Sequence, residues 1–194
     1  MKITELLNRM TAPLFFDYQA ERLFPGEPKH LVNVQLARFV RAGVLIRLKR
    51  GLYEFSHAKI DELVLANFIY RPSYISLESA LNYYGIIPDV VQNVTSISPV
   101  TTRTFKTGRG VFMYSKIVKD LYFGWQTVKD SKSDFSFMIA EPEKALLDYV
   151  YIRRIRDLTD QRIDFGTIDR GKLIKYSRIF PSWVINTINE QYNK

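Results

Sequence analysis

The sequence predicts an α+β protein in two parts, an N-terminal unit over residues 1–57 and a mixed α+β region over residues 58–194. Three observations support this prediction. Apolar residues recur at helical spacing through the first 42 residues. A short hairpin pattern containing glycine follows. Five runs rich in β-branched and aromatic residues then lie between residues 94 and 139, with helical patterns on both sides.

In the N-terminal unit, the first helix is predicted from Ile3 to Met10 and the second from Asp17 to Phe24, with Asp17 as its N-cap. The third, Lys29 to Ala42, follows the Pro25–Pro28 turn. It gathers Val32, Leu36, Phe39 and Val40 into one buried stripe and puts His30, Val34, Arg38 and Arg41 on the opposite face.

A hairpin is predicted after Gly43, which is placed to end the third helix. Its strands run from Val44 to Leu48 and from Leu52 to Phe55, and Gly51 suits the left-handed position of the loop between them. Three helices followed by a hairpin with a basic tip are typical of a winged helix-turn-helix.

The second region is predicted to begin with helices at Ala58–Tyr70 and Ser76–Tyr84. The predicted strands are Val94–Ser98, Thr101–Phe105, Val111–Tyr114, Tyr122–Val128 and Phe135–Ile139. A helix from Pro142 to about Ile155 and two C-terminal helices, Arg170–Tyr176 and Trp183–Tyr192, complete the region. Tyr83, Tyr84, Tyr122, Phe123 and Trp125 are interpreted as core residues and not as a platform for stacking bases.

The composition excludes several classes of site. The chain has 194 residues, no Cys and two His. It therefore has no disulfide framework, no thiolate nucleophile and no Cys-ligated zinc or iron–sulfur cluster. His30 and His57 do not fill a usual zinc site, although carboxylates could in principle complete one. We expect no metal and no cofactor. No apolar run approaches the ~18 residues of a membrane span, so a soluble, cytoplasmic protein is expected.

The excess of positive charge is densest in the N-terminal unit. The 28 basic and 20 acidic residues give a formal net charge of +8, and residues 1–57 hold nine basic and five acidic residues, half of that charge. A basic balance indicates either a polyanionic partner or solubility alone. The candidate DNA-binding residues are His30, Arg38, Arg41, Arg47, Lys49 and Arg50. The alternatives are a solvated helix face for the first three and charge protection of an edge strand for the hairpin.

A second acid-free stretch, residues 90–119, contains Arg103, Lys106 and Arg109. These three residues could form a second nucleic-acid surface, a patch for an acidic partner, or the exposed face of a sheet.

Catalysis has little support. The nucleophile-elbow, P-loop and dinucleotide-binding motifs are absent, and Gly108-Arg109-Gly110 lacks the third glycine. Glu143 near a helix start is explained by the helix dipole, and Lys144 with Asp148 is an i, i+4 pair. We expect no catalytic residues and no enzyme.

Five segments together resemble the AbiEi family of antitoxins and transcriptional regulators. They are Leu48–Tyr53, Pro72–Gly85, Val94–Ser96, Thr101–Arg103 and Pro142–Tyr149, and the resemblance extends from about Leu31 to Ile152. It implies an N-terminal winged helix-turn-helix and a C-terminal antitoxin domain. Family members repress their own promoters by binding inverted repeats in double-stranded DNA. They also accompany a nucleotidyltransferase-like toxin in type IV abortive-infection systems against phage.

The resemblance implies a repressor that neutralises its toxin, and in a type IV system this does not require a stable contact between the two proteins. Two alternatives stay open: an antitoxin that sequesters the toxin by direct binding, and a stand-alone winged-helix regulator. An enzyme that reverses the modification made by the toxin is a third hypothesis, for which Glu143 and Asp148 are the candidate residues.

Overall fold

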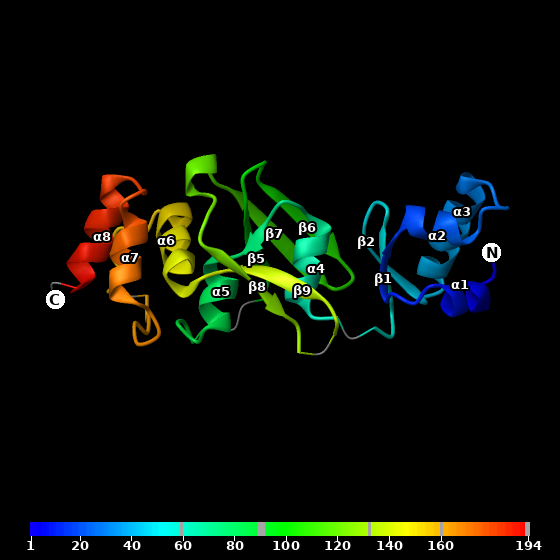
Figure 1. Ribbon diagram of the computed structural model, residues 1–194, viewed down its shortest axis with the longest axis horizontal. Helices are drawn as coiled ribbons and strands as arrows, with labels where there is room; N and C mark the ends of the chain where they lie inside the picture. Colours follow the sequence, from blue (N-terminus) through cyan, green and yellow to red (C-terminus); the bar gives the residue numbers. More distant parts are fainter. Residues whose placement is uncertain (59, 89–91, 132, 160, 193–194) are drawn as a thin grey trace.

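The computed structural model describes residues 1–58, 60–88, 92–131, 133–159 and 161–192. Within them the chain is a mixed α+β protein with eight α-helices and two β-sheets. The elements follow one another along an elongated molecule (Figure 1). The N-terminal helices lie at one end, the larger sheet lies in the middle, and the C-terminal helices lie at the other end. None of the described helices combines the length and the apolar character needed to cross a bilayer.

The N-terminal elements include the three predicted helices and the hairpin. They are α1 (Ile3–Arg9), β1 (Leu14–Phe16), α2 (Asp17–Leu23), α3 (Lys29–Arg41), β2 (Leu45–Lys49) and β3 (Leu52–Phe55). Strand β1 was not predicted, because three residues are too few for an alternating pattern to be distinguished. It pairs antiparallel with β3 and completes a sheet of order β1-β3-β2. Asp17 begins α2 and is not its N-cap, which is Phe16.

The small sheet separates two hydrophobic cores. On one face, Phe15, Tyr53 and Phe55 pack with the helical residues Leu6, Val32 and Leu36. On the other face, Leu14, Leu48 and Leu52 belong to the larger core, which continues through the rest of the chain. All four residues of β3 are consequently buried. The hairpin is therefore packed on both faces of its inner strand.

The larger sheet has the order β6-β7-β5-β4-β9-β8. Its strands are β4 (Tyr74–Ile75), β5 (Val94–Ser98), β6 (Arg103–Thr107), β7 (Gly110–Lys116), β8 (Trp125–Lys129) and β9 (Ser136–Ala140). The β5–β7 and β4–β9 pairs are parallel and the other pairs are antiparallel. Strand β4 was not predicted because it has two residues. Strand β5 is buried along its whole length, as expected for a strand covered on both faces.

Helices cover both faces of this sheet. On one face lies α4 (Glu62–Ile69), whose Ala66 carbonyl accepts a hydrogen bond from Tyr114 Oη at 2.7 Å. On the other face lie α5 (Leu77–Tyr83) and α6 (Pro142–Arg153). Thr95 of β5 accepts a hydrogen bond from α5, and Tyr74 of β4 donates one to α6. A 3₁₀ turn, η1 (Lys119–Leu121), follows β7, and α7 (Arg170–Ser177) and α8 (Ser182–Tyr192) pack beyond α6.

The helix predicted from Ala58 begins only at Glu62. The carboxylate of Asp61 accepts a hydrogen bond from the Leu63 N–H at 2.8 Å and caps α4 there. Lys59, within the predicted span, lies outside the described residues.

A buried ion pair connects α6 to β4. Lys144 and Asp148 are both fully buried, and Lys144 Nζ donates to Asp148 Oδ1. Asp148 Oδ2 also accepts hydrogen bonds from Tyr74 Oη at 2.9 Å and from Ser76 Oγ at 2.8 Å. The Lys144 ammonium lies 5.2 Å from the ring centroid of Phe123. Ser76 occupies the N-cap position of α5. Because its hydroxyl donates to Asp148, its side chain makes no capping hydrogen bond to the helix. The i, i+4 pair expected from the sequence is thus part of the interior.

We predict that breaking this pair destabilises the fold more than neutralising it. Lys144→Met leaves the Asp148 carboxylate buried without its cation, which should reduce the free energy of unfolding by about 3–5 kcal/mol. Lys144→Met with Asp148→Asn removes both charges and keeps an acceptor for the two hydroxyls. The double variant should therefore be more stable than Lys144→Met alone, as measured by urea unfolding. Additive losses in the double variant would contradict this assignment.

Candidate nucleic-acid interface

The outer face of α3 is basic and exposed. His30, Val34, Arg38 and Arg41 are all exposed, whereas Val32 and Leu36 on the opposite face are fully buried. The predicted buried stripe is confirmed at those two positions, and Phe39 and Val40 are half-buried. Helix α3 contains no acidic residue. Its outer face therefore presents only positive formal charge to solvent.

The charges of this face have no partners among the residues that the structure describes. In the described part of the chain, no ion pair or side-chain hydrogen bond is recorded for His30, Arg38 or Arg41. The neighbouring Lys29 lies 3.6 Å from Glu21, but its side chain is 83% exposed, so the pair is weak. Guanidinium groups in this state keep all their donors available for an external anion.

The hairpin tip contributes two free arginines and one partly enclosed lysine. Arg47 and Arg50 are exposed, and neither has a recorded ion pair or side-chain hydrogen bond within the described residues. Lys49 is half-buried, with its ammonium 5.8 Å from the ring centroid of Phe16. Burial, and then the nearby Arg71, lower the pKa of Lys49. Lys49 is accordingly the weakest member of the predicted set.

The tip is anchored to the start of α2. The Asp17 N–H donates to the Gly51 carbonyl at 2.9 Å. Gly51 has φ +77°, and a Cβ at this position would lie 2.9 Å from Asp17 Oδ2. Glycine is therefore required there both by backbone conformation and by the close approach of Asp17.

Arg103, Lys106 and Arg109, the possible second basic surface, do not share one face of the sheet. Arg103 and Lys106 are an odd number of residues apart on β6 and lie on opposite faces of the sheet. The Arg103 guanidinium lies 6.0 Å from the ring centroid of Tyr70. Arg109, in the turn before β7, has its side chain turned inward toward the hairpin. Residues 90 and 91 of the acid-free stretch lie outside the described residues.

Arg109 instead meets a buried carboxyl group on β3. Its Nη2 donates to the Ile60 carbonyl at 2.7 Å, and its Nε lies 3.6 Å from Glu54 Oε2. Glu54 is fully buried, and neither of its carboxyl oxygens has a hydrogen-bond partner in the described structure. Burial raises the pKa of Glu54 to about 7, partly opposed by the charge of Arg109. Sequence reasoning missed this pair, and no local pattern marks Glu54 as a partner of Arg109.

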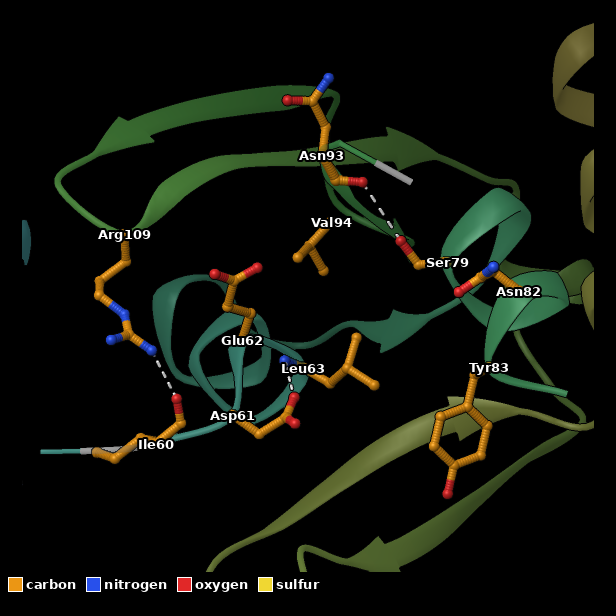
Figure 2. Close-up of a pocket in the computed structure, with 10 residues that line it drawn as sticks. All are labelled: Ile60, Asp61, Glu62, Leu63, Ser79, Asn82, Tyr83, Asn93, Val94 and Arg109. Carbon is orange, nitrogen blue, oxygen red and sulfur yellow. Dashed lines mark hydrogen bonds between the residues drawn. The ribbon is translucent and has the colours of Figure 1, made fainter. Parts of the chain in front are cut away.

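A pocket of about 400 Å³ lies beside this contact. In Figure 2, Arg109 reaches the Ile60 carbonyl at one end of it, and Asn82 and Tyr83 lie at the other. The residues that line it are Ile60, Asp61, Glu62, Leu63, Ser79, Asn82, Tyr83, Asn93, Val94 and Arg109. The Asp61 carboxylate already accepts the hydrogen bond that caps α4. Among the described residues, no group of three His, Cys, Asp or Glu side chains is placed to hold a metal ion.

Glu143 and Asp148, the acidic residues considered for catalysis, make structural contacts, and so does Glu78. Asp148 is enclosed with Lys144, as described above. Glu143 is buried, accepts from the Asp169 N–H at 3.0 Å and lies 3.2 Å from Lys172 Nζ. Glu78 forms two hydrogen bonds with the guanidinium of Arg153, at 2.6 and 2.9 Å. Within the described residues, the outer face of α3 with Arg47 and Arg50 is an arrangement whose charges are uncompensated.

Comparison of the chain with protein-family models and with curated proteins found no match.

We predict that Glu54 makes stability depend on pH. Because its pKa is raised from 4.5 to about 7 in the folded state, the folded protein binds the proton more tightly than the unfolded chain does. The stabilisation is fully present below about pH 4.5 and is lost as the pH rises through about 7. The loss should be about 3 kcal/mol. Glu54→Gln should remove this contribution in urea unfolding curves measured across that range.

The control is Glu190→Gln, which neutralises an exposed carboxyl group on α8 that does not contribute to the pKa of Glu54. This variant should keep the pH dependence of the unaltered protein. If Glu54→Gln kept it too, the buried carboxyl group would not be its source.

Proposed function

We propose that the chain is a repressor that binds double-stranded operator DNA through α3 and the β2–β3 hairpin. The observation that supports this most directly is the uncompensated basic face of α3, beside a hairpin that carries two further free arginines. DNA presents a dense array of phosphates, and unpaired Lys and Arg side chains on one element are the usual complement.

The order of the N-terminal elements also supports the proposal. A helix, a strand, two further helices and a hairpin, with the first strand added to the hairpin, is the order found in winged helix-turn-helix domains. In this assignment α3 is the recognition helix and β2–β3 is the wing. Helix α3 has 13 residues and ends at Arg41, and a major groove is wide enough to admit an α-helix.

The residues have different roles in this proposal. His30, Arg38 and Arg41 face the groove, where arginine reads guanine or holds phosphate. Arg47 and Arg50 contact the phosphate backbone from the wing. Lys49 contributes least, because it is half-buried against Phe16.

We further propose that the protein is an antitoxin of the AbiEi type, acting in the cytoplasm with a nucleotidyltransferase-like toxin. Two of the segments that resemble this family, Pro72–Gly85 and Pro142–Tyr149, are far apart in the chain. They meet at the buried network of Tyr74, Ser76, Lys144 and Asp148. We therefore interpret the network residues of these two segments as structural residues of the second region. The antitoxin function is assigned to this region.

We predict that Arg38→Ala with Arg41→Ala weakens binding to the DNA upstream of the gene, where the proposal places the operator, by about 100-fold or more. Each arginine contact in a groove is worth ~1–3 kcal/mol. Four phosphate contacts from Arg38, Arg41, Arg47 and Arg50 would give a slope of log K against log salt of about −3.6. The double variant should reduce this slope by about 2. Fluorescence anisotropy with the upstream DNA measures both quantities.

The control is Lys175→Ala with Arg178→Ala, which removes two exposed charges from the opposite end of the molecule. It should leave affinity and salt slope nearly unchanged. Unchanged affinity in the Arg38 and Arg41 variant would reject α3 as the recognition helix.

We also predict that repression and toxin neutralisation are separable. If the gene next to this one encodes a nucleotidyltransferase-like toxin, cells expressing it should be rescued by the Arg38 and Arg41 double variant as well as by the unaltered protein, because α3 is not assigned an antitoxin role. A promoter-reporter fusion in the same cells should lose repression. Loss of rescue together with loss of repression would contradict the division of roles, and co-purification of the two proteins would identify direct sequestration.

A further inference from the structure

A second pocket lies at the end of the molecule away from α3, where the end of α6 meets the start of α8 (Figure 1). Its volume is about 410 Å³, within the usual range for sites that bind small organic molecules. It is lined by Tyr151, Ile152, Arg154, Arg156, Pro181 and Trp183. The lining therefore combines two cations with apolar and aromatic surface and includes no acidic side chain.

The guanidinium of Arg156 is held in place by an aromatic ring. Its Cζ lies 4.0 Å from the ring centroid of Trp183, and Trp183 is in turn stacked on Tyr151 at 6.1 Å and 19°. Stacking of this kind uses the planar face of the guanidinium and leaves its N–H groups available as donors. The group is thus oriented before any ligand arrives, which reduces the entropy lost on binding.

The charges of the pocket are uncompensated. The adjacent Arg153 is paired with Glu78 by two hydrogen bonds. Arg154 ends α6 with φ +56°, and neither it nor Arg156 has a recorded ion pair in the described chain. Two guanidinium groups facing one pocket attract an anion, and their combined charge matches a dianion better than a single carboxylate.

We propose that this pocket binds the phosphate monoester group of an organic molecule. A phosphate monoester carries about two negative charges at neutral pH and offers three oxygens to guanidinium donors. Arg154 and Arg156 would bind the phosphate, while Ile152, Pro181 and Trp183 would contact the organic part. The site is separate from α3 and the hairpin, so it does not depend on the proposed DNA-binding function.

The test is isothermal titration of the full chain with adenosine 5′-monophosphate, inorganic phosphate and adenosine. The monophosphate should bind saturably, inorganic phosphate should compete with it, and adenosine should bind at least about tenfold more weakly, because it lacks the charged group. Arg154→Asn and Arg156→Ala should each weaken binding of the monophosphate by about tenfold or more. Asn is chosen at Arg154 because it tolerates the left-handed conformation found there.

Two further variants separate charge from geometry. Lys175→Ala removes one exposed positive charge from α7, outside the pocket, and should leave binding unchanged. Arg156→Lys keeps the charge but loses the stacked planar group, and should still weaken binding. Thermal unfolding of each variant establishes that it is folded. If Arg156→Ala unfolds, Arg154→Asn and Arg156→Lys decide the outcome.

The phosphate could come from a free nucleotide or from the 5′ end of a nucleic-acid strand. Titration with a short single strand, with and without its 5′-phosphate, distinguishes these sources. Tighter binding of the phosphorylated strand than of both the unphosphorylated strand and the monophosphate, lost in Arg156→Ala, would identify a strand end, and tighter binding of the monophosphate would identify a free nucleotide. The proposal is overturned if no phosphate compound binds saturably, if adenosine binds as well as its monophosphate, or if the pocket variants bind like Lys175→Ala.

Discussion

The structure depends on the burial of β3 between two hydrophobic cores. Tyr53 and Phe55 face the N-terminal helices, while Leu52, with Leu14 and Leu48, faces the core of the larger sheet. A strand covered on both faces loses its freedom to move independently of either core. The hairpin that carries Arg47 and Arg50 is therefore held at a defined position relative to the rest of the chain.

Two polar contacts are enclosed within this largely apolar framework. Glu54 meets Arg109 beside the small sheet, and Lys144 meets Asp148 on the far side of the larger one. The second contact is well satisfied, since Tyr74 and Ser76 supply hydrogen bonds to the carboxylate. The first is not, because at 3.6 Å it lacks a hydrogen bond, and the carboxyl group favours its protonated form. Burial of a charge is thus compensated in one place and incompletely compensated in the other.

The structure shows where the charged side chains behind the net charge of +8 lie and which of them are paired. At the N-terminal end, α3 and the hairpin present arginines without partners. At the C-terminal end, Arg153 is neutralised by Glu78, whereas Arg154 and Arg156 remain free at the edge of a pocket. In the middle, Arg109 is used for the contact with Glu54. Within the described residues, arginines without an ion pair therefore lie at both ends of the molecule, at the two sites that we propose bind anions.

The sequence by itself determined the elements whose signal is local. The stripe of Val32 and Leu36, the glycine of the hairpin loop, the run from Val94 to Ser98 and the helix that begins at Pro142 all follow from periodicity and turn chemistry within a few residues. The tertiary structure alone decided β1 and β4, which are too short to be recognised without the strands they pair with. It also decided the place of Arg109, whose partners Glu54 and Ile60 are distant in the chain. Contacts of this kind produce no periodic pattern in the sequence, because they depend on how the two cores pack and not on spacing along the chain.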